Sequence, residues 1–384
     1  MDYNQASLQA RTKNGGQIYT GLKPELNSVD DLSTHYSPGI AEPCRVIAED
    51  KQQSKILTQR RNTVAVISDG SAVLGLGNIG PEAALPVMEG KCMLLKKFGN
   101  VDGVPIVLDT QDTDELVETI VRLAPTFGGI NLEDISAPRC FEIERRVAEK
   151  VDIPVFHDDQ HGTAMVCLAA LINSLKVVEK EKGELKVVIS GAGAAGIAIA
   201  TLLREWGVVS ISMTDSKGVV DCGRGDLNDA KTDFCVINAG ETLEEALKGA
   251  DVFIGVSKAG ILKPAMIQNM NTDPIIFALA NPIPEIMPEE ALAAGAKIVA
   301  TGRSDYPNQI NNVLIFPGLF RGLLDSGISV VTPELKLKVA EALASVVENP
   351  TAERVIPSVF DERVMVAVSE SIPGPSFSPK GREE

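Results

Sequence analysis

Two pairs of adjacent acidic residues lie where they could bind a cation. Glu133 and Asp134 follow one short apolar run, and Asp158 and Asp159 follow another. If these runs are parallel strands of one sheet, both pairs face the same crevice, because ligands gather at the carboxyl ends of such strands. Carboxylates gathered there would repel one another without a cation, and oxygen ligands favour Mg2+ or Mn2+. Either pair alone would also fit a solvated loop or a helix N-cap, so the metal site requires both.

Two histidines flank the second acidic pair and raise the alternative of a zinc site. His157 precedes the pair and His161 follows it, but the chain has only three histidines. Neither lies near a cysteine that would complete a zinc site. We therefore favour Mg2+ or Mn2+, and we expect His161, at the start of a long helix, to cap or pack there.

A glycine-rich turn in the second half is typical of dinucleotide binding. It follows an apolar run and opens a helical segment, and its residues are Gly191, Ala192, Gly193, Ala194, Ala195 and Gly196. Glycines let the backbone approach a pyrophosphate, whose charge meets the helix N-terminus. Asp215 follows Gly196 by 19 residues, where its carboxylate can accept hydrogen bonds from an adenosine ribose. The pattern predicts a Rossmann-type domain, against the alternative of a packing turn without a ligand.

The residues after this turn bear on the choice between NAD and NADP. Asp215 disfavours the 2'-phosphate of NADP because the two charges repel. Ser216, Lys217 and Arg224 would accommodate that phosphate. We favour NAD as the cofactor and keep NADP as the alternative.

Short apolar runs alternate with helical segments along most of the chain. This alternation predicts an α/β fold with two parallel-sheet domains, the second of Rossmann type. The expected strands are 64–68, 105–109, 129–132, 154–156, 185–190, 210–214, 251–256, 275–278 and 297–300, and the expected helices are 81–97, 113–123, 161–178, 197–206 and 333–348. We expect a catalytic, metal-binding domain at 1–165, a dinucleotide-binding domain with C-terminal helices at 166–372, and a flexible tail at 373–384.

Composition narrows the class of function. A net charge of -16 repels nucleic acid. No apolar run reaches the roughly 18 residues that a membrane span needs, and the polar N-terminus does not resemble a signal peptide. The six cysteines form no CxxC pair and fit reduced, mostly buried thiols better than disulfides. We expect a cytoplasmic enzyme that binds neither nucleic acid nor membrane.

Seven segments together carry a resemblance to a known family. They are YSPGIA at 36–41, SDGSAVLGLGNIG at 68–80, VMEGK at 87–91, GINLED at 129–134, HDDQHGT at 157–163, LANP at 279–282 and NQINN at 308–312. With these segments in this order, the chain resembles the small prokaryotic-type malic enzymes (malate dehydrogenase, oxaloacetate-decarboxylating) over roughly residues 10 to 365. The resemblance implies metal-dependent oxidative decarboxylation of L-malate to pyruvate and CO2 with reduction of NAD or NADP, and also decarboxylation of oxaloacetate.

The resemblance also assigns roles to individual residues. It implies that Glu133, Asp134 and Asp159 bind the metal. Lys91 is expected to bind substrate as the general base, and Tyr36 is expected to be the general acid. Substrate would also be bound by two asparagines, Asn281 and Asn312, of which Asn281 would contact the cofactor as well. A homodimer or larger homo-oligomer is implied, and an active site that combines groups from two chains is a hypothesis.

Lys91 needs a lowered pKa to act as a base. A free lysine, with a pKa of about 10.4, is a poor proton acceptor at neutral pH. A nearby dication penalises the ammonium form, so we expect Lys91 to be neutral near working pH.

One departure from the family leaves part of the site unassigned. Larger members carry a malate-binding arginine where this chain has Val73. A malolactic enzyme, which would release lactate, and a 2-hydroxy-acid dehydrogenase without decarboxylation are the alternative enzymes. A catalytically dead NAD-sensing protein is the alternative outside catalysis.

Overall fold

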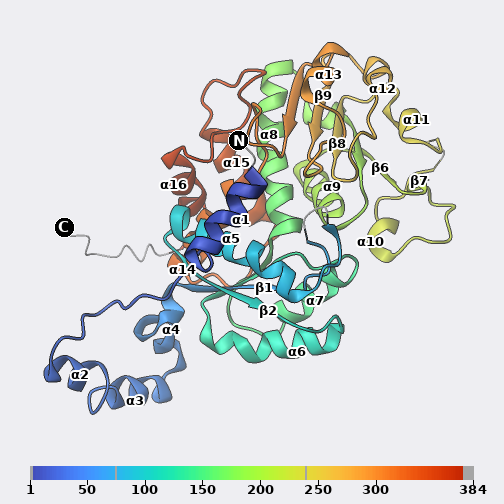
Figure 1. Ribbon diagram of the computed structural model, residues 1–384. Coiled ribbons are helices and arrows are strands. Elements are labelled where there is room, and N and C mark those ends of the chain that lie inside the picture. The colour runs from blue at the N-terminus through green and yellow to red at the C-terminus, as the bar shows by residue number, and fades with distance from the viewer. Residues whose placement is uncertain (1–2, 74–75, 238–239, 375–384) are drawn as a thin grey trace.

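The computed structural model describes residues 3–73, 76–237 and 240–374. Figure 1 shows two sheets, one in the lower half of the molecule and one in the upper half, with the long helix α8 (Thr163–Val178) beside both. The predicted fold class, two parallel-sheet α/β units, is confirmed.

The first sheet has four parallel strands in the order β2-β1-β3-β4. They are β1 (Thr63–Ser68), β2 (Asp102–Val107), β3 (Gly129–Leu132) and β4 (Val155–His157), and the connecting helices are α5 (Pro81–Gly99), α6 (Thr113–Leu123) and α7 (Arg139–Ala148). Every residue of β1 and β3 is buried, as expected of apolar runs inside a parallel sheet. Because β3 and β4 are neighbours, both acidic pairs leave the sheet at the same edge.

The second sheet has six strands in the order β10-β9-β8-β5-β6-β7. They are β5 (Lys186–Ser190), β6 (Ser210–Asp215), β7 (Gly218–Val219), β8 (Val252–Gly255), β9 (Ile275–Ala278) and β10 (Ile298–Thr301), of which β7 alone is antiparallel in this sheet. The helices that follow these strands are α9 (Ala194–Trp206), α10 (Asp229–Thr232), α11 (Leu243–Leu247), α12 (Pro264–Gln268) and α13 (Pro288–Ala293). All nine predicted strands are present within a few residues of their expected bounds.

Three C-terminal helices pack as a group against helices α8 and α5. They are α14 (Phe316–Ser326), α15 (Pro333–Ser345) and α16 (Glu362–Glu370), with α15 against α8 and α14 against both α5 and α16. The helical stretch Asp158–Val178 is long and apolar enough to cross a membrane, but 67% of its most apolar window is buried inside the fold. It is therefore explained as a core helix. The domain bounds at 165 and 372 remain a prediction, and most of the expected tail lies outside the described residues.

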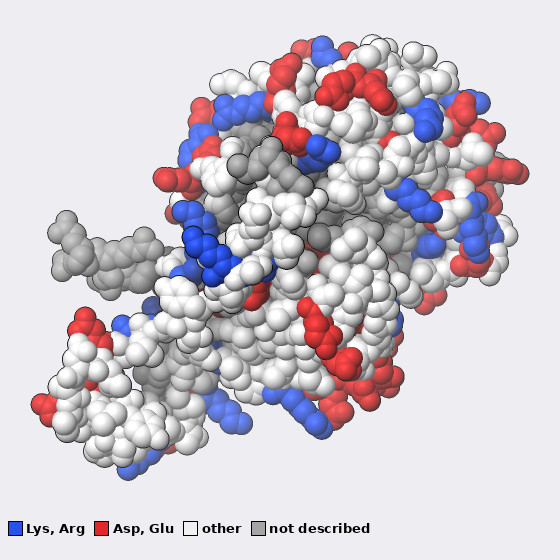
Figure 2. Space-filling view, viewed as in Figure 1, with Lys and Arg blue, Asp and Glu red and all other residues white. Residues whose placement is uncertain are grey.

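The N-terminal helices have no buried core of their own. They are α1 (Tyr3–Asn14), α2 (Val29–His35), α3 (Ala41–Glu49) and α4 (Ser54–Leu57), and none of them contains a buried residue. Helices α2 and α3 project away from the body at the lower left of Figure 1, and in Figure 2 this part shows white surface with charged residues scattered over it. We call residues 17–57 the arm.

The prediction that all six cysteines are reduced is wrong. Cys222 and Cys235 form a disulfide. The sequence hides this pairing because it depends on a bridge between Asp221 and Val236, which brings the two cysteines together across a loop. Cys92, Cys140 and Cys167 are buried free thiols, as expected, and burial raises the pKa of the Cys92 thiol to about 12.

Candidate active site

Three carboxylates from the two acidic pairs converge at the edge of the first sheet. One oxygen each of Glu133, Asp134 and Asp159 lies within 4.8 Å of the other two. The backbone positions them: Asp134 adopts a left-handed φ of 54°, and its N–H donates to Asp159 Oδ2 at 2.8 Å. Glu133 is 2% exposed, and burial together with the neighbouring carboxylates raises its pKa well above the ordinary value. An oxygen-only, partly buried and acidic donor set of this kind fits Mg2+ or Mn2+.

Lys91 reaches the same carboxylates from helix α5. Its Nζ lies 2.9 Å from Glu133 Oε1 and donates a short hydrogen bond to Asp158 Oδ2. Burial by itself lowers the pKa of Lys91, but Asp158, Glu133 and Asp159 together raise it above the ordinary lysine value.

The expectation of a neutral Lys91 concerns the metal-bound site and stays a prediction, because without a cation the surrounding carboxylates keep the pKa of Lys91 above the ordinary value. The expectation considered only a dication, whereas the carboxylates that would bind that dication also surround the ammonium group. A cation bound by these carboxylates would offset the field that keeps Lys91 protonated.

Asn312 joins this cluster from a different part of the chain. It begins a short 3-10 turn, Asn312–Leu314, and its Nδ2 donates to Asp158 Oδ2 at 3.1 Å. Thr163 donates its hydroxyl to Asn312 Oδ1 at 3.0 Å, which fixes the orientation of the amide. The structure thus brings Asn312 to the carboxylate that pairs with Lys91, as a substrate-side residue requires.

The glycine-rich turn has the shape that a dinucleotide needs. Gly191 has a φ of 117°, and a Cβ there would lie 2.6 Å from the Val256 carbonyl oxygen. A Cβ on Gly193 would meet nothing within 4 Å, so the backbone is open on the side where helix α9 begins. This open turn before a helix N-terminus fits a pyrophosphate.

Asp215 ends strand β6, as predicted, but its carboxylate is already occupied. Its Oδ1 accepts from Arg224 Nη1 and the Lys217 N–H, each at 2.9 Å. Its Oδ2 accepts from Arg224 Nη2 at 2.9 Å and Lys231 Nζ at 2.7 Å.

Asn281 follows strand β9 in a loop that a buried residue holds in place. Glu285 is 0% exposed and accepts from two backbone N–H groups, Ser257 at 2.9 Å and Ala280 at 3.0 Å. One carboxylate thus ties the loop after β8 to the loop that carries Asn281. Sequence reasoning missed Glu285; the signal was an acid inside the otherwise apolar run after Asn281–Pro282.

We predict that Glu285→Gln displaces the Asn281 loop. The amide offers one acceptor where the carboxylate offers two, so one buried N–H faces a donor, which should lower the free energy of unfolding by about 1–3 kcal/mol. We expect kcat for the enzyme reaction to fall about tenfold. Glu290→Gln, at an exposed position on helix α13, is the matched control. Wild-type turnover and wild-type stability in Glu285→Gln would contradict this role.

Comparison with known proteins agrees with this geometry. The family model described as "Malic enzyme, NAD binding domain" matches residues 160–372, and the model "Malic enzyme, N-terminal domain" matches 13–113 and 110–148. The chain belongs to the malic enzyme family.

Individual malic enzymes are similar over nearly the whole chain. A bifunctional malic/malolactic enzyme of Bacillus subtilis is 52% identical over 97% of this chain and 92% of its own. An NAD-dependent malic enzyme of Geobacillus stearothermophilus is also 52% identical, over 93% of this chain and 76% of its own. A crystal structure of an NAD-dependent malic enzyme from Thermotoga maritima superposes with a TM-score of 0.92 at 47% identity, covering 95% of this chain and 98% of that one. The chain is accordingly an oxidoreductase of the malic enzyme type.

Tyr36 is a predicted site residue that the structure does not bring to Lys91. It follows helix α2 on the arm and is 63% exposed. In Figure 1 helix α2 lies well away from α5, which carries Lys91. The sequence could not predict the separation of Tyr36 from Lys91, because a sequence motif does not say where its segment lies relative to the rest of the folded chain.

Val73 is a buried residue that follows Ala72, whose N–H donates to the Asp134 carbonyl oxygen, and Arg139 is a nearby cation besides Lys91. Val73 is 1% exposed, and its hydrocarbon side chain offers no charge to a malate carboxylate. Arg139 donates through Nη2 to Asp69 Oδ2 at 2.8 Å and to the Ser71 and Ser136 hydroxyls at 2.9 and 3.1 Å. It therefore ties the loop after β1 to the loop that carries Asp134, a positioning role that sequence reasoning missed.

His161 packs as expected and is not arranged as a zinc ligand. Its Nε2 lies 2.9 Å from Glu144 Oε2 and its Nδ1 lies 3.0 Å from Lys336 Nζ. Among the residues described, the carboxylates Glu133, Asp134 and Asp159 form the cluster with metal-binding spacing, and it contains no histidine.

Proposed function

We propose that this malic enzyme catalyses the divalent-metal-dependent oxidative decarboxylation of L-malate to pyruvate and CO2, with NAD or NADP as the oxidant. The observation that carries the proposal is the contact of Lys91 with Glu133 and Asp158 beside the two other carboxylates. A simple 2-hydroxy-acid dehydrogenase needs no such cluster.

The proposed mechanism assigns one task to each side chain. Glu133, Asp134 and Asp159 would hold the metal, which would supply Lewis-acid chemistry to the substrate, and the glycine-rich turn would hold the dinucleotide, which would supply the hydride acceptor. Lys91 removes the proton of the C2 hydroxyl, a step in which its contacts with Glu133 and Asp158 orient the amine. Asn312 holds Asp158 in place through its amide. Tyr36 delivers a proton to C3 after CO2 has left.

The same site supports decarboxylation of added oxaloacetate, since that reaction omits only the oxidation at C2, in which Lys91 takes a proton and the cofactor a hydride. A malolactic reaction is the second candidate, because a relative with 52% identity is named a bifunctional malic/malolactic enzyme.

A product assay separates these reactions. We expect L-malate with Mn2+ and NAD to give pyruvate, abolished by EDTA, whereas lactate without net NADH would support the malolactic reaction and oxaloacetate alone would contradict decarboxylation.

We also propose that the enzyme acts as a homodimer in which the arm of one chain delivers Tyr36 to the site of the other. Many of the exposed large apolar side chains lie on this short part of the chain, among them Tyr19, Leu22, Leu26, Val29, Leu32, Ile40, Ile56 and Leu57. Apolar surface of this extent is characteristic of an interface.

L-malate is the small-molecule substrate in the proposed function. The cytoplasmic location of the enzyme stays a prediction.

Mixed dimers test the shared site. Lys91→Arg and Tyr36→Phe homodimers should each be nearly inactive. If Tyr36 acts across the interface, each hybrid dimer contains one intact site. Because half of a randomly assorted population is hybrid, co-expression should restore about a quarter of wild-type activity. Activity no higher than that of the two separate variants would place Tyr36 in the site of its own chain and contradict the sharing.

A further inference from the structure

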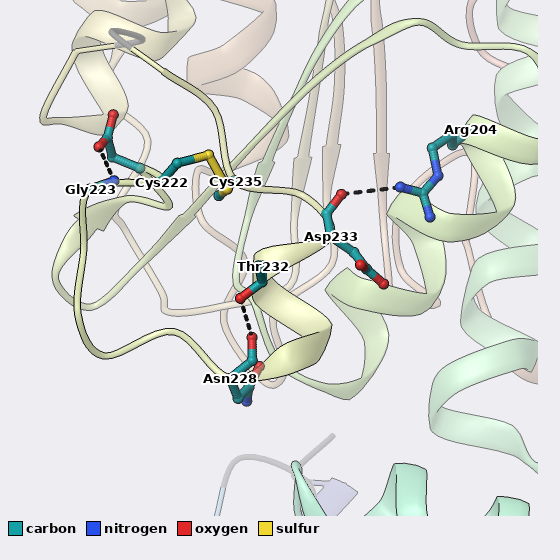
Figure 3. Close-up of a disulfide and its surroundings, with 8 residues drawn as sticks. Arg204, Cys222, Gly223, Asn228, Thr232, Asp233 and Cys235 are labelled. Atoms are coloured by element: carbon teal, nitrogen blue, oxygen red, sulfur yellow. Dashed lines mark hydrogen bonds between the residues drawn. A yellow bond between two sulfur atoms is a disulfide. The ribbon is translucent and has the colours of Figure 1, made fainter.

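The disulfide-closed loop 222–235 lies against the carboxylate where an adenosine ribose is expected. Its two ends are joined by the Cys222–Cys235 bond, and helix α10 lies within it (Figure 3). The loop supplies Arg224 and Lys231, both of which contact Asp215. Loop 222–235 is therefore closed by a covalent bond and lies beside the part of the proposed dinucleotide site that would bind the adenosine ribose.

The contacts from this loop leave Asp215 no acceptor to spare. A carboxylate offers about four lone-pair sites. Four donors reach it here: the Lys217 N–H, two nitrogens of Arg224 and the Lys231 ammonium group. The hydroxyls of an NAD ribose must displace at least one of them to be accepted by Asp215.

The same contacts place positive charge where a 2'-phosphate would come. Asp215 and Asp226 contribute two negative charges, whereas Lys217, Arg224 and Lys231 contribute three positive ones. The balance of these five side chains is one positive charge. Arg224 and Lys231 are 15% and 21% exposed, so neither is a freely solvated surface cation.

We propose that loop 222–235 sets the choice between NAD and NADP. With the disulfide closed, Arg224 and Lys231 stay on Asp215, which masks the acceptor for ribose hydroxyls and favours a 2'-phosphate. With the disulfide open, the loop releases Asp215, and the preference moves towards NAD. This inference rests on the proposed dinucleotide site and not on the malate chemistry.

The disulfide is placed where a dithiol reductant can reach it. Cys222 is exposed, whereas Cys235 is partly buried. A dithiol breaks the bond by thiol–disulfide exchange: one thiolate attacks a sulfur, the second resolves the mixed disulfide, and two cysteine thiols and an oxidised dithiol result. The ends of the loop remain paired because the Cys222 N–H donates to Val236 O and the Val236 N–H donates to Val220 O, each at 3.0 Å. Reduction therefore loosens the loop without unfolding the strand beside it.

The experiment measures dinucleotide affinity, without malate, on the whole protein in two redox states. Calorimetric Kd values for NAD and NADP are taken after oxidation and after dithiothreitol treatment, with thiols counted in both states. We expect two more thiols after reduction and a rise of about tenfold in the ratio of the NADP Kd to the NAD Kd. Cys222→Ser should show the reduced ratio in both states. Cys44→Ser, which removes an exposed thiol outside the loop, should keep the full response.

Two kinds of result would contradict the proposal, and they can be told apart. Six free thiols after oxidation, or the same Kd ratio in both states, would overturn the role of the loop and leave malate decarboxylation untouched. Absence of binding by either dinucleotide in either state would overturn the dinucleotide site itself, and with it both proposals.

Discussion

Lys91→Arg should lower kcat with malate by about 10²–10⁴, because it removes a proton acceptor while it keeps a positive charge. Arginine is not deprotonated in proteins, so it cannot take the proton of the C2 hydroxyl. Its charge still compensates Glu133 and Asp158, which are both buried. This variant separates catalysis from stability better than Lys91→Ala, which would leave two buried carboxylates without their cation. Steady-state kinetics at saturating malate and cofactor measure the effect.

The matched control for Lys91→Arg is Lys97→Arg, on the same helix and at an exposed position. It should retain wild-type kcat and thermal stability. A Lys91→Arg variant that keeps more than about a tenth of the wild-type kcat would show that another group is the base.

Asp159→Asn should weaken the binding of Mn2+ by more than tenfold and lower kcat/KM for malate by about 10³. The substitution removes one of three carboxylates whose oxygens converge within 4.8 Å. It also weakens the acceptor for the Asp134 N–H, which positions a second carboxylate of the cluster. Calorimetric titration with Mn2+ measures the affinity. The malate assay at a higher Mn2+ concentration then shows how much activity the metal restores.

Asp109→Asn provides the control for the loss of one acidic charge near the same sheet. Asp109 follows strand β2 and is exposed, outside the carboxylate cluster. This control should bind Mn2+ as the wild type does. Equal Mn2+ affinity in wild type and Asp159→Asn would remove Asp159 from the metal site.

The sequence predicted the sheets well because most of their strands are buried on both faces. Strands β3 and β9 have the predicted bounds, since apolar runs of that kind are interrupted only where the chain leaves the core. Helix α14 was missed because Pro317, Gly318 and Gly322 are typical of a loop. In the structure they permit close packing: a Cβ on Gly322 would lie 2.5 Å from Ile372 Cδ1.

The candidate site was predictable where a motif and a strand end coincide, and not where a contact comes from a distant segment. Both acidic pairs leave one edge of one sheet, so their meeting followed from the pattern. The protonation of Lys91 depends on its contact with Asp158. No local sequence pattern predicts that contact, because the two residues are far apart in the chain. The disulfide and the separation of Tyr36 from Lys91 likewise depend on how distant segments are placed.

The central claim is that hydride leaves C2 of malate for the nicotinamide and that CO2 then leaves the product. L-malate deuterated at C2, incubated with Mn2+ and NAD, tests it by mass spectrometry of the reduced cofactor together with a pyruvate assay. We predict deuterium in the reduced nicotinamide and one pyruvate for each reduced cofactor. Deuterium retained in lactate with no net reduced cofactor, or labelled cofactor accompanied by oxaloacetate without pyruvate, would contradict the claim.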